Sequence, residues 1–173
     1  HAEQVYTSML ANEQERGIAR RILLRLVQFG QGRPDTRRQQ TVVELRAGMD
    51  DTAGFDRVLG VLTANRLLTL SDEARQVDLS HEALIRGWPR LYEWINERRA
   101  AELTRRQLEE KADERGRLRQ GNGAGGLLDP VELAEAEAWV NGPDAAELGV
   151  SDELKALVAD SRTAIDAAAL EKE

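Results

Sequence analysis

The spacing of the apolar residues changes once along the chain, and this change limits the folds that the sequence can adopt. Between residues 12 and 62, apolar side chains recur every three or four positions, as they do in amphipathic helices. Between residues 68 and 79 they alternate with polar residues on both sides of a polar turn. The alternating residues are Leu68, Leu70, Val77 and Leu79. This pattern is typical of a β-hairpin, so the sequence predicts helices followed by a small hairpin.

Three helices are expected before this hairpin. The first spans residues 12–29 and the second residues 41–48, and a polar loop at residues 31–40 separates them. The third begins near Thr52, whose hydroxyl is expected to cap it. Its apolar stripe consists of Phe55, Val58, Leu59 and Leu62. Three helices followed by a two-stranded hairpin is the order of a winged helix, a variant of the helix-turn-helix.

A helical region is predicted for the second half of the chain. Pro89 suits the first turn of a helix, and we expect this helix to continue to about Leu118. The glycine-rich stretch at residues 121–126 predicts a flexible loop. The expected fold class is therefore mainly α, with a winged-helix domain over residues 1–87. A helical domain over residues 88–173 follows, with one long helix, the loop and two C-terminal helices.

The two C-terminal helices have recognisable starts. Asp129, Pro130 and Glu132 supply a cap, a proline at the first position and a capping-box carboxylate. Pro143 is expected to end that helix, and Ser151 is expected to cap the next one. The residues expected to face inward on the first of these helices are Val131, Ala134 and Ala138.

Charge and composition exclude several classes of function. The formal net charge is −7, with −9 on residues 129–173 and +2 on residues 1–128. Because phosphate binding needs a basic surface, the acidic second part argues against nucleic acid as a partner of the whole chain. The absence of cysteine excludes disulfides and thiolate metal sites. With no apolar run of membrane-spanning length and no signal peptide, we expect a cytoplasmic protein without a membrane partner.

The sequence offers no complete catalytic site. It lacks a glycine-rich phosphate loop that ends in lysine and serine or threonine. His1 and His81 are too few for a histidine metal cluster. Ser80 precedes His81 directly, and adjacent residues on a helix do not reach each other as nucleophile and base. We therefore expect no catalytic residue, no metal site and no cofactor held by this chain alone.

One junction does suggest binding chemistry. His81 lies where the second hairpin strand gives way to a short helix that is expected to run from a Ser80 cap to Gly87. Free N–H groups at the start of a helix attract phosphate, and an imidazole there can donate a hydrogen bond to an anion. The simpler interpretation is that His81 only packs at this junction.

The residues around this junction resemble a known family. The run VDLSHEALIRGWPRLYEWINERR, residues 77–99, is similar to the signature of bacterial STAND-type signalling ATPases that carry C-terminal WD-type repeats. The segment before it resembles their winged-helix domain. The runs LLDPVELAEAEAWV and ELKALVADSRTAID resemble the helical region that precedes their repeats. The resemblance covers nearly the whole chain and is most specific between Ser80 and Leu91.

This resemblance implies a regulatory role for the chain. In STAND proteins a histidine of the MHD motif contacts the β-phosphate of ADP, and His81 occupies that position, with Glu82 at the place of the aspartate. The chain begins with His1 instead of methionine, so we expect it to be a segment of a longer ATPase. The implied ligands are ADP and ATP in the parent protein. The implied partners are an upstream ATPase core and a downstream repeat domain in the same parent chain. The implied role of the parent protein is signal transduction.

Two other interpretations remain at this point. A DNA-binding winged-helix regulator would read DNA with residues 52–66, which contain only Arg57 and Arg66 as basic residues. In that case Arg33, Arg37 and Arg38 could contact phosphates. Alternatively, the chain is an inert helical scaffold between an ATPase and its repeats. Apolar surface that normally meets the ATPase core would also allow self-association.

Overall fold

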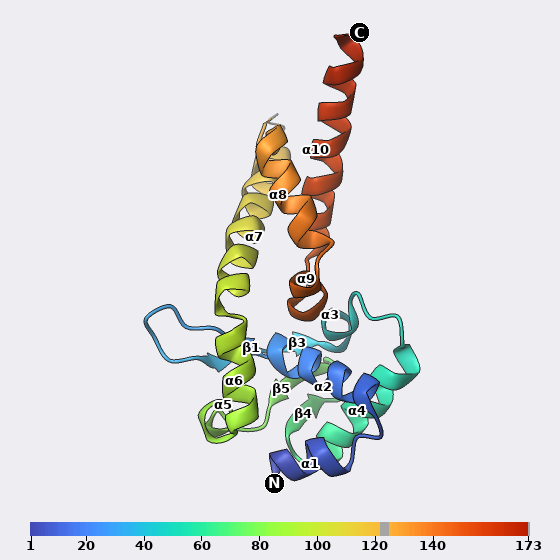
Figure 1. The fold of residues 1–173 in the computed structure, drawn as a ribbon, viewed down its shortest axis with the longest axis vertical. Coiled ribbons are helices and arrows are strands. Elements are labelled where there is room, and N and C mark those ends of the chain that lie inside the picture. Colours follow the sequence, from blue (N-terminus) through green and yellow to red (C-terminus); the bar gives the residue numbers. More distant parts are fainter. Residues whose placement is uncertain (122–124, 173) are drawn as a thin grey trace. The chain divides into compact units, whose positions relative to one another are not determined.

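The computed structural model describes residues 1–121 and 125–172 and is mainly helical, with small antiparallel sheets (Figure 1). This confirms the predicted fold class. The chain divides into two compact units. The first comprises residues 1–99 and 147–149, and the second comprises residues 100–146 and residues from 150 onward.

The first unit contains short strands interleaved with helices. Its elements are α1 (Ala2–Ser8), α2 (Glu13–Arg25), β1 (Val27–Gln28), β2 (Thr36–Arg37), β3 (Gln40–Thr41), α3 (Val42–Arg46), α4 (Thr52–Ala64), β4 (Leu68–Ser71), β5 (Gln76–Leu79), α5 (Ala83–Gly87) and α6 (Pro89–Glu97). All three helices expected before the hairpin are present. The predicted Thr52 cap is wrong by one residue, because Asp51 accepts a hydrogen bond from the Gly54 N–H at 2.8 Å and takes that role.

The predicted hairpin is confirmed as β4 and β5. These strands pair antiparallel with Leu68 opposite Leu79, and β3 adds to the other edge of β5 to give the order β3-β5-β4. A second pair, β1 with β2, was not predicted, and it places Thr36 and Arg37 in a strand within the expected loop. A two-residue strand carries too little alternation to be recognised from sequence.

The apolar core of the first unit takes buried residues from helices α2, α3, α4 and α6 and from strands β4 and β5. Its members come from every long element of the first unit because each presents one apolar stripe inward. Residues of this unit with no exposed surface include Ala19, Ile22, Leu23, Leu26, Leu45, Phe55, Val58, Val77, Leu79, Leu91 and Ile95. This core fixes β5, which ends just before the segment containing His81, and α6, which follows the short helix α5.

The second unit is entirely helical in its described residues. Its elements are α7 (Arg99–Gln120), α8 (Pro130–Val140), α9 (Pro143–Leu148) and α10 (Asp152–Glu171), of which α7 begins and α9 ends within the first unit. The core consists of Ala112, Leu128, Leu133, Ala136, Leu154 and Leu157. The predicted capping box of Asp129 with Glu132 and the Ser151 cap are both confirmed.

Two predictions about these helices are wrong and one is incomplete. The helix before Pro143 ends as expected, but Pro143 also begins α9, so the described residues contain one more C-terminal helix than predicted. The helix expected from Pro89 to Leu118 is interrupted at Arg98, where the side chains of Arg98 and Arg99 bond Glu147 and Asp35. On α8, Val131 is 69% exposed, and Leu133 and Ala136 are buried instead. That helix is apolar on more than one face, so its sequence does not select the inward side.

The predicted glycine-rich loop falls partly outside the described residues, since residues 122–124 are among those not described. Within residues 1–121 and 125–172, no helix combines the length and the apolar character needed to cross a membrane.

Candidate functional site

The segment that contains His81 is a three-residue connection between β5 and α5. Strand β5 ends at the buried Leu79, and α5 begins at Ala83. The Ser80 N–H donates to the Leu67 carbonyl at 3.0 Å, which holds the start of the connection against the base of the hairpin. The side chains of His81 and Glu82 are both exposed. The structure therefore places the predicted site residues next to each other on the surface.

The expected Ser80 cap is not formed. Helix α5 starts at Ala83, and its capping residue Glu82 makes no side-chain hydrogen bond. The Ser80 hydroxyl lies two residues too early to reach the first-turn N–H groups, and its buried Oγ has no hydrogen-bond partner among the described residues. Helix α5 has only five residues, so its dipole adds little to anion binding. Any affinity of this junction for an anion must come from the imidazole.

Arg37 holds the connection from the side. Its guanidinium donates from Nη1 to the Leu79 carbonyl at 3.2 Å and lies with Nε 3.8 Å from Glu82 Oε1. From the sequence, Arg37 was expected only as a possible phosphate contact, and these two interactions were not predicted. Its position depends on the β1–β2 pairing, and no sequence pattern revealed that pairing.

The residues after the connection form a packing cluster. Glu3 of α1 accepts hydrogen bonds from Trp88 Nε1 at 3.0 Å and from Arg90 at 2.8 and 2.6 Å. The hydrogen bonds from Arg90 and Trp88 lower the Glu3 pKa to about 2. The rings of Tyr6, Trp88 and Trp94 meet edge to face, with centroids 5.3–6.1 Å apart. Trp88, Arg90 and Trp94 therefore hold α1 against the start of α6 through packing and hydrogen bonds.

The arginines considered for DNA binding mostly contact protein groups. Arg57 on α4 forms an ion pair with the buried Glu15 of α2. Arg37 bonds the Leu79 carbonyl and lies beside Glu82, and Arg38 also interacts with another residue of the protein. Among the described residues, no cluster of three or more histidine, aspartate or glutamate side chains could hold a metal ion.

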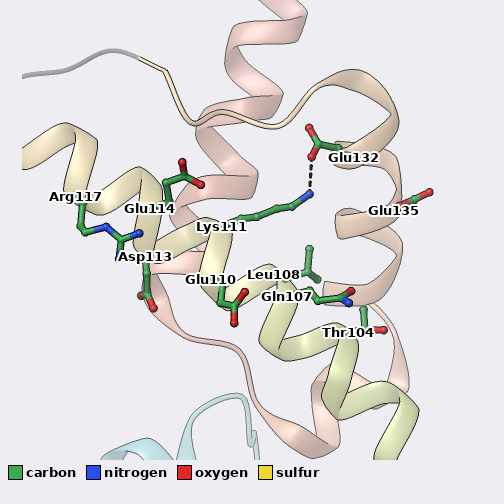
Figure 2. A pocket seen from close by; sticks show the side chains of 10 residues that line it. All are labelled: Thr104, Gln107, Leu108, Glu110, Lys111, Asp113, Glu114, Arg117, Glu132 and Glu135. Carbon is green, nitrogen blue, oxygen red and sulfur yellow. Dashed lines mark hydrogen bonds and ion pairs between the residues drawn. The ribbon is translucent and has the colours of Figure 1, made fainter.

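A separate pocket of about 590 Å³ lies in the second unit along α7 and the start of α8. Figure 2 shows Lys111 reaching toward Glu132, and the two side chains are 2.5 Å apart. Glu110, Asp113 and Glu114 also line this pocket. No predicted site residue lies in this acidic groove.

One comparison with known proteins gives a match. The model of a family described as novel STAND NTPase 1 matches residues 1–122, which include the hairpin, His81 and all of α7. No curated protein matches the chain. No solved structure matches it either.

Proposed function

The chain belongs to the novel STAND NTPase 1 family, and we propose that it is the nucleotide-state-sensing regulatory segment of a signal-transduction ATPase. In this proposal the segment holds an upstream ATPase core in an ADP-bound inactive state and joins it to downstream sensor repeats. The observation that carries the proposal is the exposed His81 at the end of β5, inside the matched residues.

The order of elements supports the winged-helix interpretation on which this role depends. Helix α2 is followed by β3, α3, α4, β4 and β5, and the sheet order is β3-β5-β4. The last strand is therefore central in the sheet, and its buried residues Val77 and Leu79 anchor it in the core. His81 lies two residues after this strand, so its backbone is held near the core while its exposed side chain stays open to a neighbouring module.

His81 would act as a donor to a diphosphate presented by the ATPase core. An imidazole N–H can donate to a phosphate oxygen, and a hydrogen bond to a charged group contributes about 1.5–3 kcal/mol. Glu82 would act as a positioning residue, because a carboxylate repels phosphate and Glu82 already lies beside Arg37. A contribution of this size shifts an equilibrium about tenfold or more, which is enough to bias a switch between silent and active states.

The test is the substitution His81→Ala in the longer protein that carries the ATPase core. We expect the purified variant to retain much less ADP than the wild type and to show higher basal activity, because the silent state loses one contact to the diphosphate. His1→Ala is the matched control, since its imidazole bonds the Asn65 carbonyl at the end of α4 instead. Unchanged ADP retention in His81→Ala would leave the chain with the role of a scaffold.

A further inference from the structure

The first unit contains a second surface feature that the His81 proposal does not use. A pocket of about 630 Å³ lies between the β1–β2 connection, helices α5 and α6, and the first residue of α7. Its polar and aromatic lining consists of Arg33, Asp35, Arg86, Tyr92 and Arg99. We call it the arginine pocket.

Asp35 and Arg99 form the fixed wall of the arginine pocket. Arg99 donates to Asp35 through both terminal nitrogens, at 2.9 and 2.7 Å, and its Nε donates to Asn96 at 2.9 Å. Burial tends to raise the Asp35 pKa, but hydrogen bonds from Arg99 and the Gly30 N–H, together with the charges of Arg99 and Arg86, lower it overall. Asp35 is therefore ionised at neutral pH, and its charge is matched by Arg99.

Arg33 and Arg86 are not hydrogen-bonded to any carboxylate in the described residues, although the charge of Arg86 acts on Asp35. Both are exposed, and neither makes a hydrogen bond or an ion pair with any residue that the structure describes. Because Asp35 offsets Arg99, the lining keeps an excess of two positive charges. Two guanidinium groups facing one hollow repel each other unless an anion lies between them, so their placement there favours an anionic ligand.

The turn that carries Arg33 has little freedom to move. A side chain at Gly30 would bring a Cβ within 2.0 Å of the Arg33 carbonyl oxygen, so only glycine fits there. The Gly30 N–H donates to Asp35 at 2.8 Å, and Pro34 restricts the backbone between them. The Arg33 backbone is thus positioned before any ligand arrives, which lowers the entropic cost of binding.

We propose that the arginine pocket binds the phosphate group of a small phosphorylated ligand. Arg33 and Arg86 donate to the phosphate oxygens, and Tyr92, which is 45% exposed, packs against the organic part. The pocket is within the size range of sites that hold small organic ligands. Neither His81 nor Glu82 lines it, so the proposal does not depend on the role proposed for that junction.

Titration calorimetry on the 173-residue chain tests this proposal, with adenosine monophosphate, adenosine and inorganic phosphate as probes at low salt. We expect the monophosphate to bind, adenosine not to bind, and added salt to weaken the binding. Arg33→Gln and Arg86→Gln should each weaken it about tenfold or more, because each removes a hydrogen bond to a charged group. Tyr92→Leu should weaken binding of the monophosphate and leave inorganic phosphate unaffected.

A control variant makes the result specific. Arg75→Gln removes an exposed arginine on the β4–β5 turn, outside the arginine pocket, so it should not change binding here. Equal affinity for the monophosphate and for inorganic phosphate would identify free phosphate as the ligand and support the anion site. The proposal is overturned if neither phosphate compound binds at millimolar concentration, or if Arg75→Gln weakens binding as much as Arg33→Gln and Arg86→Gln do in correctly folded protein.

Discussion

The two units of the molecule use charged side chains differently. In the first unit, arginines join segments that lie far apart in the sequence, as Arg90 does with Glu3 and Arg99 does with Asp35. The Arg25 Nε donates across 122 positions to the Glu147 carbonyl. In the second unit, the most buried ion pair among the described residues is local, since Glu102 bonds Arg105 three residues further along α7. The ion pairs that join distant segments of this unit, such as that of Arg162 with Glu137, are more exposed.

The apolar cores of the two units also differ, in the size of their buried side chains. The first unit buries large side chains from helices and sheet alike, including Phe55 and Trp88. The core of the second unit has six buried residues, two of them alanine. The first unit is therefore held by extensive packing and long-range hydrogen bonds, whereas the second depends on a small core and well-formed helix caps. Substitutions of matching chemistry in the two units test this contrast.

Phe55→Ala should have the largest effect on stability. The side chain has no exposed surface, and removing a buried phenyl ring costs about 3–5 kcal/mol. Urea unfolding followed by tryptophan fluorescence measures the loss, because Trp88 and Trp94 both lie in the first unit. Val43→Ala, at a residue that is 70% exposed, should change stability by less than about 0.5 kcal/mol. Similar effects for both variants would contradict the assignment of this core.

Arg25→Met should have the second largest effect on stability. Arg25 is 5% exposed and donates to the carbonyls of Leu45, Ala47 and Glu147 at 2.7–3.1 Å. Methionine fills much of the space of the arginine stem but leaves these carbonyls without that donor, at a cost of about 2–3 kcal/mol in the free energy of unfolding. Arg21→Met, on the same helix, is the control. If both variants are equally stable, the three hydrogen bonds contribute nothing measurable.

Ser161→Ala is the corresponding change in the second unit, with a smaller expected effect. The Ser161 hydroxyl is fully buried and accepts from the Leu128 N–H at 3.0 Å. Its loss leaves the Leu128 N–H without a hydrogen-bond partner, which costs about 1–2 kcal/mol in the free energy of unfolding. Thr163→Ala removes an exposed hydroxyl that bonds within its own helix, so it should have a lesser effect. Urea unfolding followed by circular dichroism measures both, and a loss for Ser161→Ala as large as that for Arg25→Met would remove the contrast between the units.

Glu3→Gln should have the smallest effect, and that effect should depend on pH. The Glu3 pKa is lowered from 4.5 to about 2 in the folded protein. A lowered carboxyl pKa stabilises the fold above the unfolded value of 4.5, and this stabilisation disappears as the pH falls through about 2. Because the side chain is half exposed, we expect a loss below about 1 kcal/mol at pH 7. Thermal unfolding at pH 7 and pH 2 measures it, and an equal loss at both values would refute an electrostatic origin.

The sequence predicted those parts of the fold whose signals are local. The alternation at Val77 and Leu79 predicted the hairpin, and the capping residues Asp129 and Ser151 predicted two helix starts correctly. The inward face of α8 could not be predicted, because both candidate faces of that helix are apolar. The interruption at Arg98 was also missed, since it coincides with contacts to residues that are distant in the sequence.

The position of His81 could be predicted from the sequence, but the contacts around it could not. The alternation of β5 placed His81 just after a strand, and the ring is exposed there. The hydrogen bond from Arg37 to the Leu79 carbonyl and the arginine pocket both depend on the course of the chain between β1 and β2. That course follows from tertiary pairing, which no local pattern of residues 31–40 specifies.

The assignment of residues 147–149 to the first unit has a practical consequence for expressing it alone. The Glu147 carboxylate bonds Arg20 and Arg98, and its carbonyl accepts from Arg25. A protein shortened at residue 122, where the family match ends, would lack residues 147–149. Arg20, Arg25 and Arg98 would then lose their contacts with Glu147. The first unit is discontinuous along the chain, so no single cut releases it whole, and residues 147–149 would have to be added back as a peptide or grafted through a linker.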